Sequence, residues 1–174
     1  MNLFNNGYLT KFNSLDHTLF NVSVEFMENY IFESDQKKII LQNLDDLHVF
    51  ILPFDKSLKN ILDNDIFNFV KKNHNYIIGF ILLDESAKTD KLQYIDYIDT
   101  RIKKHNLASH MIQLYEQQNN IILVPYDILK SASSYWKKYF ERKYNIKTIN
   151  ALDNWVNSMN IKKNIKWDHL IDLY

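Results

Sequence analysis

LQYIDYIDT-RIKKHN-LASHMIQLYEQQ, residues 92–118, contains the three consecutive elements that decide the fold. Aromatic and β-branched residues dominate Leu92–Thr100, which predicts a strand. Apolar side chains at helical spacing predict a helix over Leu107–Gln118. Between them lies the loop Arg101–Asn106, whose side chains are mostly basic. The stretch therefore predicts a strand that enters a helix through a basic loop.

The elements on either side complete a recognisable order. Tyr76–Asp84, YIIGFILLD, predicts a second strand, which a polar loop joins to Leu92–Thr100 as an antiparallel hairpin. Ile121–Val124 predicts a short buried strand after the helix, and Ser131–Tyr144 a further helix. A strand, crossover helix and second strand make those two strands parallel neighbours.

The first half of the chain gives weaker signals. Leu19–Met27 alternates apolar and polar residues, which predicts a strand, and Asp35–Leu47 has apolar residues at helical spacing. His48–Phe54 predicts a strand that Pro53 terminates. Ser57–Lys72 predicts a helix with one apolar face, capped by Ser57 or Asp55.

The last 25 residues predict a helical C-terminus. Apolar residues recur at helical spacing in two sets, first Leu152, Trp155, Val156 and Met159, then Trp167, Leu170 and Ile171. Such a terminus either covers the sheet or forms a homodimer contact. No linker or repeat divides the chain, so we expect one α/β (α+β) domain over residues 1–174. Its mixed, mostly antiparallel central sheet would be flanked by helices.

Composition limits the function classes. Hydrophobic residues make up 46% of the 174 residues, and 21 Lys plus Arg balance 21 Asp plus Glu. There is no net charge to attract nucleic acid over long range. The lack of Cys excludes thiolate chemistry, and the six His residues show no metal-ligand spacing with carboxylates, so we expect no metal. No apolar run has membrane-spanning length and no signal peptide is apparent, so we expect a cytoplasmic protein without a membrane partner.

The loop before the predicted helix Leu107–Gln118 is a candidate phosphate site. The first-turn N–H groups of a helix lack intrahelical partners, and the helix dipole favours anions there. Lys103, Lys104 and His105 would add cationic side chains. The alternative is a solvated basic connection without a ligand.

Lys103-Lys104-His105-Asn106-Leu107-Ala108 resembles the (Arg/Gln)-x-x-Gly-x-(Gly/Ala) motif of the GNAT acyltransferases. In this family the motif lies between a strand and a helix and binds the pyrophosphate of acetyl-CoA. The resemblance covers residues 76–144, and it implies that Ile98 before the motif and Ser109 after it belong to the cofactor site. Asn106 stands where the family has Gly, and Asn is the other residue that readily adopts the left-handed region. Lys103 replaces Arg, which keeps the charge and loses the planar fork.

The helix Ser131–Tyr144 carries a second part of the resemblance. Relatives have a Tyr five residues before a Phe, as Tyr135 and Phe140 are here, although Tyr139 stands where the family often has Gly. The resemblance implies that Tyr135 protonates the departing thiolate of CoA. The alternative is that Tyr135 is an amphipathic aromatic residue that only packs.

A general base is less clear from the sequence. Asp96 and Asp99 fall on opposite faces of their strand, so at most one would face the acceptor. Asp96, in mid-strand, is the better candidate, with a hydrogen-bonded structural carboxylate as the alternative. His105 belongs to the phosphate loop and is a poor candidate for the base.

These features favour an acyl-CoA-dependent N-acyltransferase that transfers acetyl from acetyl-CoA to an amine acceptor by direct attack. The alternative from another class is a catalytically inactive GNAT-like binding or interaction module. A third interpretation is nucleic-acid binding through the aromatic and basic residues of 135–144, YWKKYFERKY, but helical periodicity explains these residues better.

Overall fold

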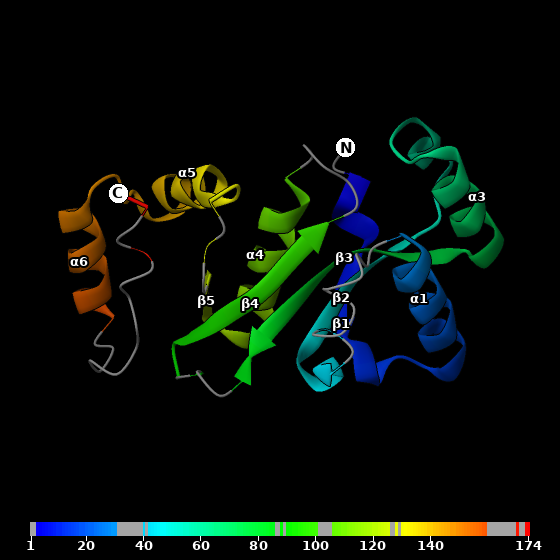
Figure 1. Cartoon of the computed structure of the whole chain (residues 1–174), viewed down its shortest axis with the longest axis horizontal. Coiled ribbons are helices and arrows are strands. Elements are labelled where there is room, and N and C mark those ends of the chain that lie inside the picture. The colour runs from blue at the N-terminus through cyan, green and yellow to red at the C-terminus, as the bar shows by residue number, and fades with distance from the viewer. Residues whose placement is uncertain are drawn as a thin grey trace. The chain divides into compact units, whose positions relative to one another are not determined.

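The computed structural model describes residues 3–30, 40, 42–85, 88, 90–100, 106–125, 128, 130–159, 170, 173 and 174 (Figure 1). Its strands are β1 Tyr8–Lys11, β2 Leu47–Pro53, β3 Asn75–Asp84, β4 Leu92–Thr100 and β5 Ile122–Pro125. Its described α-helices are α1 His17–Tyr30, α3 Asn64–Asn73, α4 Leu107–Asn119, α5 Ser133–Tyr144 and α6 Ile149–Ser158. The protein is α+β, as the sequence predicts, and its C-terminal region is helical.

One mixed, mostly antiparallel sheet contains the five described strands in the order β1-β2-β3-β4-β5. β2 pairs antiparallel with β1 and with β3, and β4 runs opposite to its neighbour β3 (Figure 1). β4 and β5 are parallel, with paired residues from Leu92↔Ile122 to Ile95↔Pro125. The predicted hairpin and the predicted crossover through α4 are both confirmed.

The chain forms two compact units that share the sheet. Unit 1 consists of Met1–Leu83 and Tyr97–Asn120, and unit 2 of Asp84–Asp96 and Ile121–Tyr174. β4 therefore contributes its first five residues to unit 2 and its last four to unit 1. The end of β4 and all of α4 lie in unit 1, whereas β5, α5 and α6 lie in unit 2.

Unit 1 packs helices on both sides of its strands. Figure 1 shows α4 on one side and α1 with α3 on the other. On the α4 side, the ring of His110 lies edge-on to Phe50 of β2 at 5.7 Å, and that of Tyr115 lies edge-on to His48 at 4.9 Å. Because helices cover both faces of the sheet in this unit, its strands are nearly continuous runs of apolar residues. Six of the seven β2 residues are buried.

Unit 2 is built around aromatic side chains. Trp136 and Phe140 of α5 are buried, and the ring of Trp155 from α6 lies 5.8 Å from that of Phe140. The hydroxyl of Tyr174 donates a hydrogen bond to the carbonyl of Ile146 at 3.0 Å. The predicted helix through Leu152 and Met159 is α6, whereas most of the second predicted set, including Trp167, lies outside the described residues.

The predicted strand Leu19–Met27 is wrong, because this segment lies within α1. Ser23, Phe26 and Met27 are buried at helical spacing, and Asp16 caps the helix by accepting the N–H of Leu19 at 2.9 Å. Phe20, Val22 and Val24 alternate with other residues as they would in a strand. The buried residues lie three and four positions apart instead, on one face of the helix. The capping aspartate was the sequence signal that favours a helix.

The predicted helix Ser57–Lys72 forms two pieces. Asp55 caps the 3₁₀ turn η4, Lys56–Asn60, by accepting the Ser57 N–H at 2.7 Å, and α3 then begins anew at Asn64. Inside a helix, Asp and Asn side chains compete for the backbone hydrogen bonds. Residues 63–65, Asp-Asn-Asp, therefore favour the start of a new helix over the continuation of an existing one.

The rest of the first half agrees with the sequence only in part. β2 confirms the strand predicted from His48 to Phe54 and ends at Pro53, whereas the four-residue strand β1 was not predicted. Six of the 13 residues of the helix predicted over Asp35–Leu47 lie outside the described residues. Ile40 and Gln42 are helical, Leu44–Asp46 form the 3₁₀ turn η3, and Leu47 already belongs to β2.

Candidate cofactor site and catalytic residues

The amino end of α4 has the backbone conformation that the phosphate-loop prediction requires. Asn106 lies in the left-handed region, with φ 56° and ψ 22°, and α4 begins at the next residue, Leu107. The carbonyl of Asn106 accepts the N–H of His110 at 3.0 Å, which is the first helical hydrogen bond. Asn106 therefore adopts the left-handed conformation that Asn tolerates better than other residues with a side chain.

The other predicted cofactor residues divide into two groups. Ile98 on β4 and Ala108 and Ser109 in the first turn of α4 are half-buried, and Leu107 is buried at 1% exposure. Lys103, Lys104 and His105 lie outside the described residues. The described part of the site therefore consists of the end of β4 and the start of α4, both in unit 1.

A glycine on β3 lets α4 lie close to the sheet. A Cβ on Gly79 would stand 2.7 Å from the sulfur of Met111 on α4 and 3.0 Å from the backbone carbonyl oxygen of Asp99 on β4. Real Cβ atoms essentially never approach a sulfur so closely, so a larger residue would displace Met111. Gly79 thus fixes the depth at which the helix that follows Asn106 sits against the strands.

Tyr135, the predicted acid, lies on α5 in unit 2 and is half-buried. Its ring stacks on that of Tyr139 at 6.2 Å and meets Trp136 edge-on at 5.2 Å. These contacts fix the ring and agree with packing as well as with positioning for chemistry.

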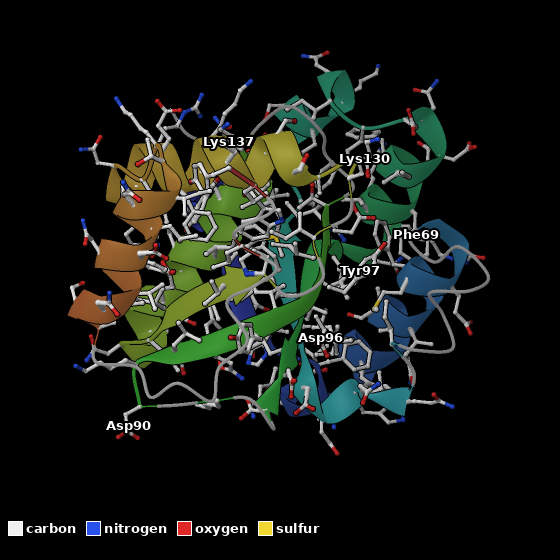
Figure 2. The ribbon with its side chains drawn as sticks, turned by 60° about the vertical axis from the view of Figure 1, so that its left-hand side comes forward. Phe69, Asp90, Asp96, Tyr97, Lys130 and Lys137 are labelled. Atoms are coloured by element: carbon white, nitrogen blue, oxygen red, sulfur yellow. The ribbon has the colours of Figure 1, made fainter. Side chains whose placement is uncertain are left out.

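Asp96, the predicted base, is an exposed residue at the end of the part of β4 that belongs to unit 2. Figure 2 shows Asp96 on β4 away from α5, the helix that carries Tyr135 and the labelled Lys137. The two predicted catalytic side chains are therefore not brought side by side. Asp99 is half-buried instead, and its carboxylate accepts the backbone N–H of Thr100 at 2.7 Å.

Lys143, near the end of α5, is a chemically distinctive residue that the sequence analysis did not single out. Its Nζ donates a hydrogen bond to the hydroxyl of Tyr139 at 2.9 Å and lies 5.2 Å and 5.1 Å from the ring centroids of Tyr139 and Tyr144. Burial lowers the pKa of Lys143 to about 8. The i, i+4 spacing of Tyr139 and Lys143 was the signal that could have found this pair.

Burial of the aromatic rings bears on nucleic-acid binding. Trp136, Tyr139 and Phe140 are at most 6% exposed, so their faces are not offered to bases. Stacking on accessible aromatic rings supplies much of the affinity for single strands. The burial therefore agrees with the helical-packing interpretation of residues 135–144.

Among the described residues, no helix is long and apolar enough to cross a bilayer. No three of their His, Asp or Glu side chains form a group that could hold a metal ion.

No protein-family model, curated protein or solved structure matches the chain, so known proteins neither support nor refute its resemblance to the GNAT acyltransferases.

Proposed function

We propose that the protein is an acyl-CoA-dependent N-acyltransferase of GNAT type, which transfers acetyl from acetyl-CoA to an amine acceptor. The left-handed Asn106 at the start of α4 carries this proposal, because it supports a turn that presents backbone N–H groups to a pyrophosphate. The β4–α4–β5 crossover gives the motif the strand–loop–helix context that the resemblance demands.

The proposed chemistry needs no covalent enzyme intermediate. The neutral amine attacks the thioester carbonyl carbon, a C–N bond forms, and the C–S bond breaks as the thiolate departs. Backbone N–H groups would polarise the carbonyl, and the resemblance assigns protonation of the thiolate to Tyr135. Asp96 remains the proposed base on sequence grounds alone. We further propose a cytoplasmic location.

A second candidate is a GNAT-like module that binds without turnover. The exposed position of Asp96 away from α5 favours it, because a general base has to lie within hydrogen-bond reach of the amine that it deprotonates. The packed ring of Tyr135 fits this candidate as well. Release of free thiol from acetyl-CoA in the presence of amines separates the two candidates.

Cofactor binding is tested by thermal unfolding with and without acetyl-CoA. At about 100 times the dissociation constant, a ligand that binds only the folded state adds about 2.7 kcal/mol of stability. We expect a clear rise in Tm with acetyl-CoA and a much smaller one with fragments that lack the pyrophosphate. Equal shifts from both ligands would contradict a pyrophosphate site.

The chain offers a matched control for the loop. Asn120 ends α4 with φ 52°, so Val at position 120 meets the same left-handed penalty as Val at position 106. We expect Asn106→Val to abolish the acetyl-CoA shift, Asn120→Val to retain it, and Asn106→Gly to behave as the parent. If Asn106→Val binds acetyl-CoA as tightly as Asn120→Val does, the proposed role of the loop is wrong.

A further inference from the structure

The single Asn-Gly dipeptide of the chain, Asn6-Gly7, lies between a 3₁₀ turn, η1 (Leu3–Asn6), and β1. Asn6 is exposed and Gly7 is half-buried. A Cβ on Gly7 would overlap the ring of Phe50 on β2 and stand 3.2 Å from the carbonyl oxygen of Ile51. Packing against the buried Phe50 ring therefore requires glycine after Asn6, unless that ring moves.

An asparagine that precedes a glycine can lose its side-chain amide without a catalyst. The backbone nitrogen of Gly7 attacks the side-chain amide carbon of Asn6, and a new C–N bond closes a five-membered imide. The bond from that carbon to the amide nitrogen breaks, and ammonia leaves with the proton that the backbone nitrogen loses. Water then opens the imide at either carbonyl, which gives aspartate or isoaspartate. Glycine favours this reaction because it has no Cβ to hinder the attack.

The folded chain restrains both reacting groups. The N–H of Gly7 donates a hydrogen bond to the carbonyl of Phe4 at 2.9 Å, which keeps the proton on the attacking nitrogen. Asn6 is the last residue of η1, and ψ in a 3₁₀ turn is about −20 to −30°. Ring closure needs a ψ far from this value, because the nitrogen has to swing toward the side-chain carbon. The reaction therefore requires η1 to open.

Contacts on both sides of the dipeptide oppose this opening. The side chain of Phe4 is only 3% exposed, and its ring centroid lies 6.4 Å from that of His110 on α4. Immediately after Gly7, Tyr8 of β1 pairs with Ile51 of β2. Opening of η1 would return the apolar surface of a buried phenylalanine to water, which is costly. The open state is therefore a minor one within the folded ensemble.

We propose that Asn6 is a deamidation site whose reaction rate is set by local opening of the amino-terminal segment, residues 3–8. Its two products affect the fold differently. Aspartate adds a negative charge at an exposed position and leaves the backbone unchanged. Isoaspartate adds one backbone atom between the carbonyl of Phe4 and the N–H of Gly7, while Gly7 stays confined by Phe50. The lengthened backbone cannot re-form the same turn, so isoaspartate makes the opening permanent.

The experiment incubates the full chain in mildly alkaline buffer, with and without urea above its unfolding midpoint, and peptide mass spectrometry follows each asparagine. In urea, Asn6 should react faster than Asn13, an exposed asparagine that precedes a serine. Without urea, Asn6 should react at least about tenfold more slowly than in urea, which corresponds to an opening free energy of at least about 1.4 kcal/mol. Equal rates at Asn6 in the two buffers overturn the proposal, and so does a rate at Asn13 in urea that matches the rate at Asn6.

Two variants distinguish local opening from unfolding of the whole chain. Phe4→Ala removes the buried ring that holds η1, so the rate at Asn6 without urea should rise toward the rate in urea. Phe67→Ala is the matched control, because it truncates an aromatic residue on α3 that packs against Phe54 at 5.6 Å. It should leave the rate at Asn6 unchanged, and an equal acceleration in both variants overturns the role of local opening. The urea comparison uses the parent chain alone, so it decides the proposal even if Phe4→Ala does not fold.

The stability of the products tests the proposed consequence. Asn6→Asp reproduces the aspartate product and should unfold at the same urea concentration as the parent. The isoaspartate product, separated by chromatography after deamidation in urea and then refolded, should unfold at a lower urea concentration. An isoaspartate product as stable as Asn6→Asp would show that the backbone of η1 tolerates the extra atom, which contradicts a permanent opening. None of these measurements involves acetyl-CoA, so their outcome is independent of the proposed acyltransferase function.

Discussion

Helices α4 and α5 each follow a strand of the same sheet, yet they bury different chemistry. α4 presents Leu107, Met111 and Ile112 to the strands of unit 1, and a glycine on β3 makes room for it. α5 buries Trp136, Tyr139 and Phe140, with the amine of Lys143 at one end of the cluster. The packing of α4 thus depends on shape and backbone conformation, whereas α5 holds a lysine and two tyrosines whose pKa values burial shifts.

We expect the largest loss of stability from a substitution that disturbs the packing of α4 against the sheet. Gly79→Val should destabilise the protein by about 3 kcal/mol, because its Cβ would meet the Met111 sulfur at 2.7 Å and the added methyl groups need further space. Gly79→Ala should cost less, since the thioether of Met111 can move. Urea unfolding measures both, and equal midpoints for Val, Ala and parent would show that α4 is not seated by Gly79.

The next prediction tests whether Tyr135 on α5 takes part in the chemistry. If Tyr135 protonates the thiolate, Tyr135→Phe keeps the ring stacked on Tyr139 and removes only the hydroxyl, so kcat falls on the order of 10²-fold while acetyl-CoA affinity persists. Tyr135→Ala should in addition lower stability through lost aromatic packing. An unchanged kcat in the Phe variant, beside a destabilised Ala variant, would remove Tyr135 from the mechanism.

The same contrast explains what the sequence could predict. β3, β4, α4 and β5 were predicted to within two residues, because the strands are rich in β-branched and aromatic residues, Asn120 in the left-handed region ends α4, and Pro125 ends β5. α1 was predicted as a strand because several of its apolar residues alternate with polar ones. The sequence signal that favours a helix over a strand here is the capping residue Asp16.

The candidate site was predictable to a different degree. The conformation of Asn106 could be predicted from its position between a strand and a helix, since a tight turn into a helix needs a residue that tolerates positive φ. The lowered pKa of Lys143 could not be predicted from the sequence, because its cause is burial of the side chain. Spacing along one helix gives neighbours, whereas desolvation depends on tertiary contacts.

A smaller effect should appear in alkaline solution and belongs to α5. The pKa of Lys143 is about 8 in the folded state and near 10.5 when unfolded, so between these values the unfolded chain binds more protons and stability rises with pH. The gain should be on the order of 1 kcal/mol, because a half-exposed amine realises only part of the shift. Above about pH 10 the unfolded tyrosines ionise while Tyr139 and Tyr144 stay protonated, which reverses the trend.

Urea unfolding from pH 7 to 10 measures this effect. Lys143→Met retains an unbranched apolar stem without the amine, so its stability should not rise over this interval. Lys138→Met is the matched exposed control on the same helix and should keep the rise. A rise of equal size in Lys143→Met would place its origin elsewhere.

We expect the smallest change in stability at acidic pH, from His110 on α4. His110 is half-buried between the rings of Phe4 and Phe50, and burial lowers its pKa below the usual 6.5, although a hydrogen bond that the ring donates to the backbone of Phe4 opposes the shift. Below pH 6.5 the unfolded chain therefore binds the proton more readily, and stability falls as the pH drops toward the folded pKa. The loss should stay below about 1 kcal/mol between pH 7 and 5.5, since the imidazole is only half-buried. His110→Phe keeps a ring against Phe50 and cannot titrate, so its stability should be flatter over this interval. Unfolding at the two pH values decides the matter, and an undiminished acid loss in His110→Phe would assign the dependence to another group.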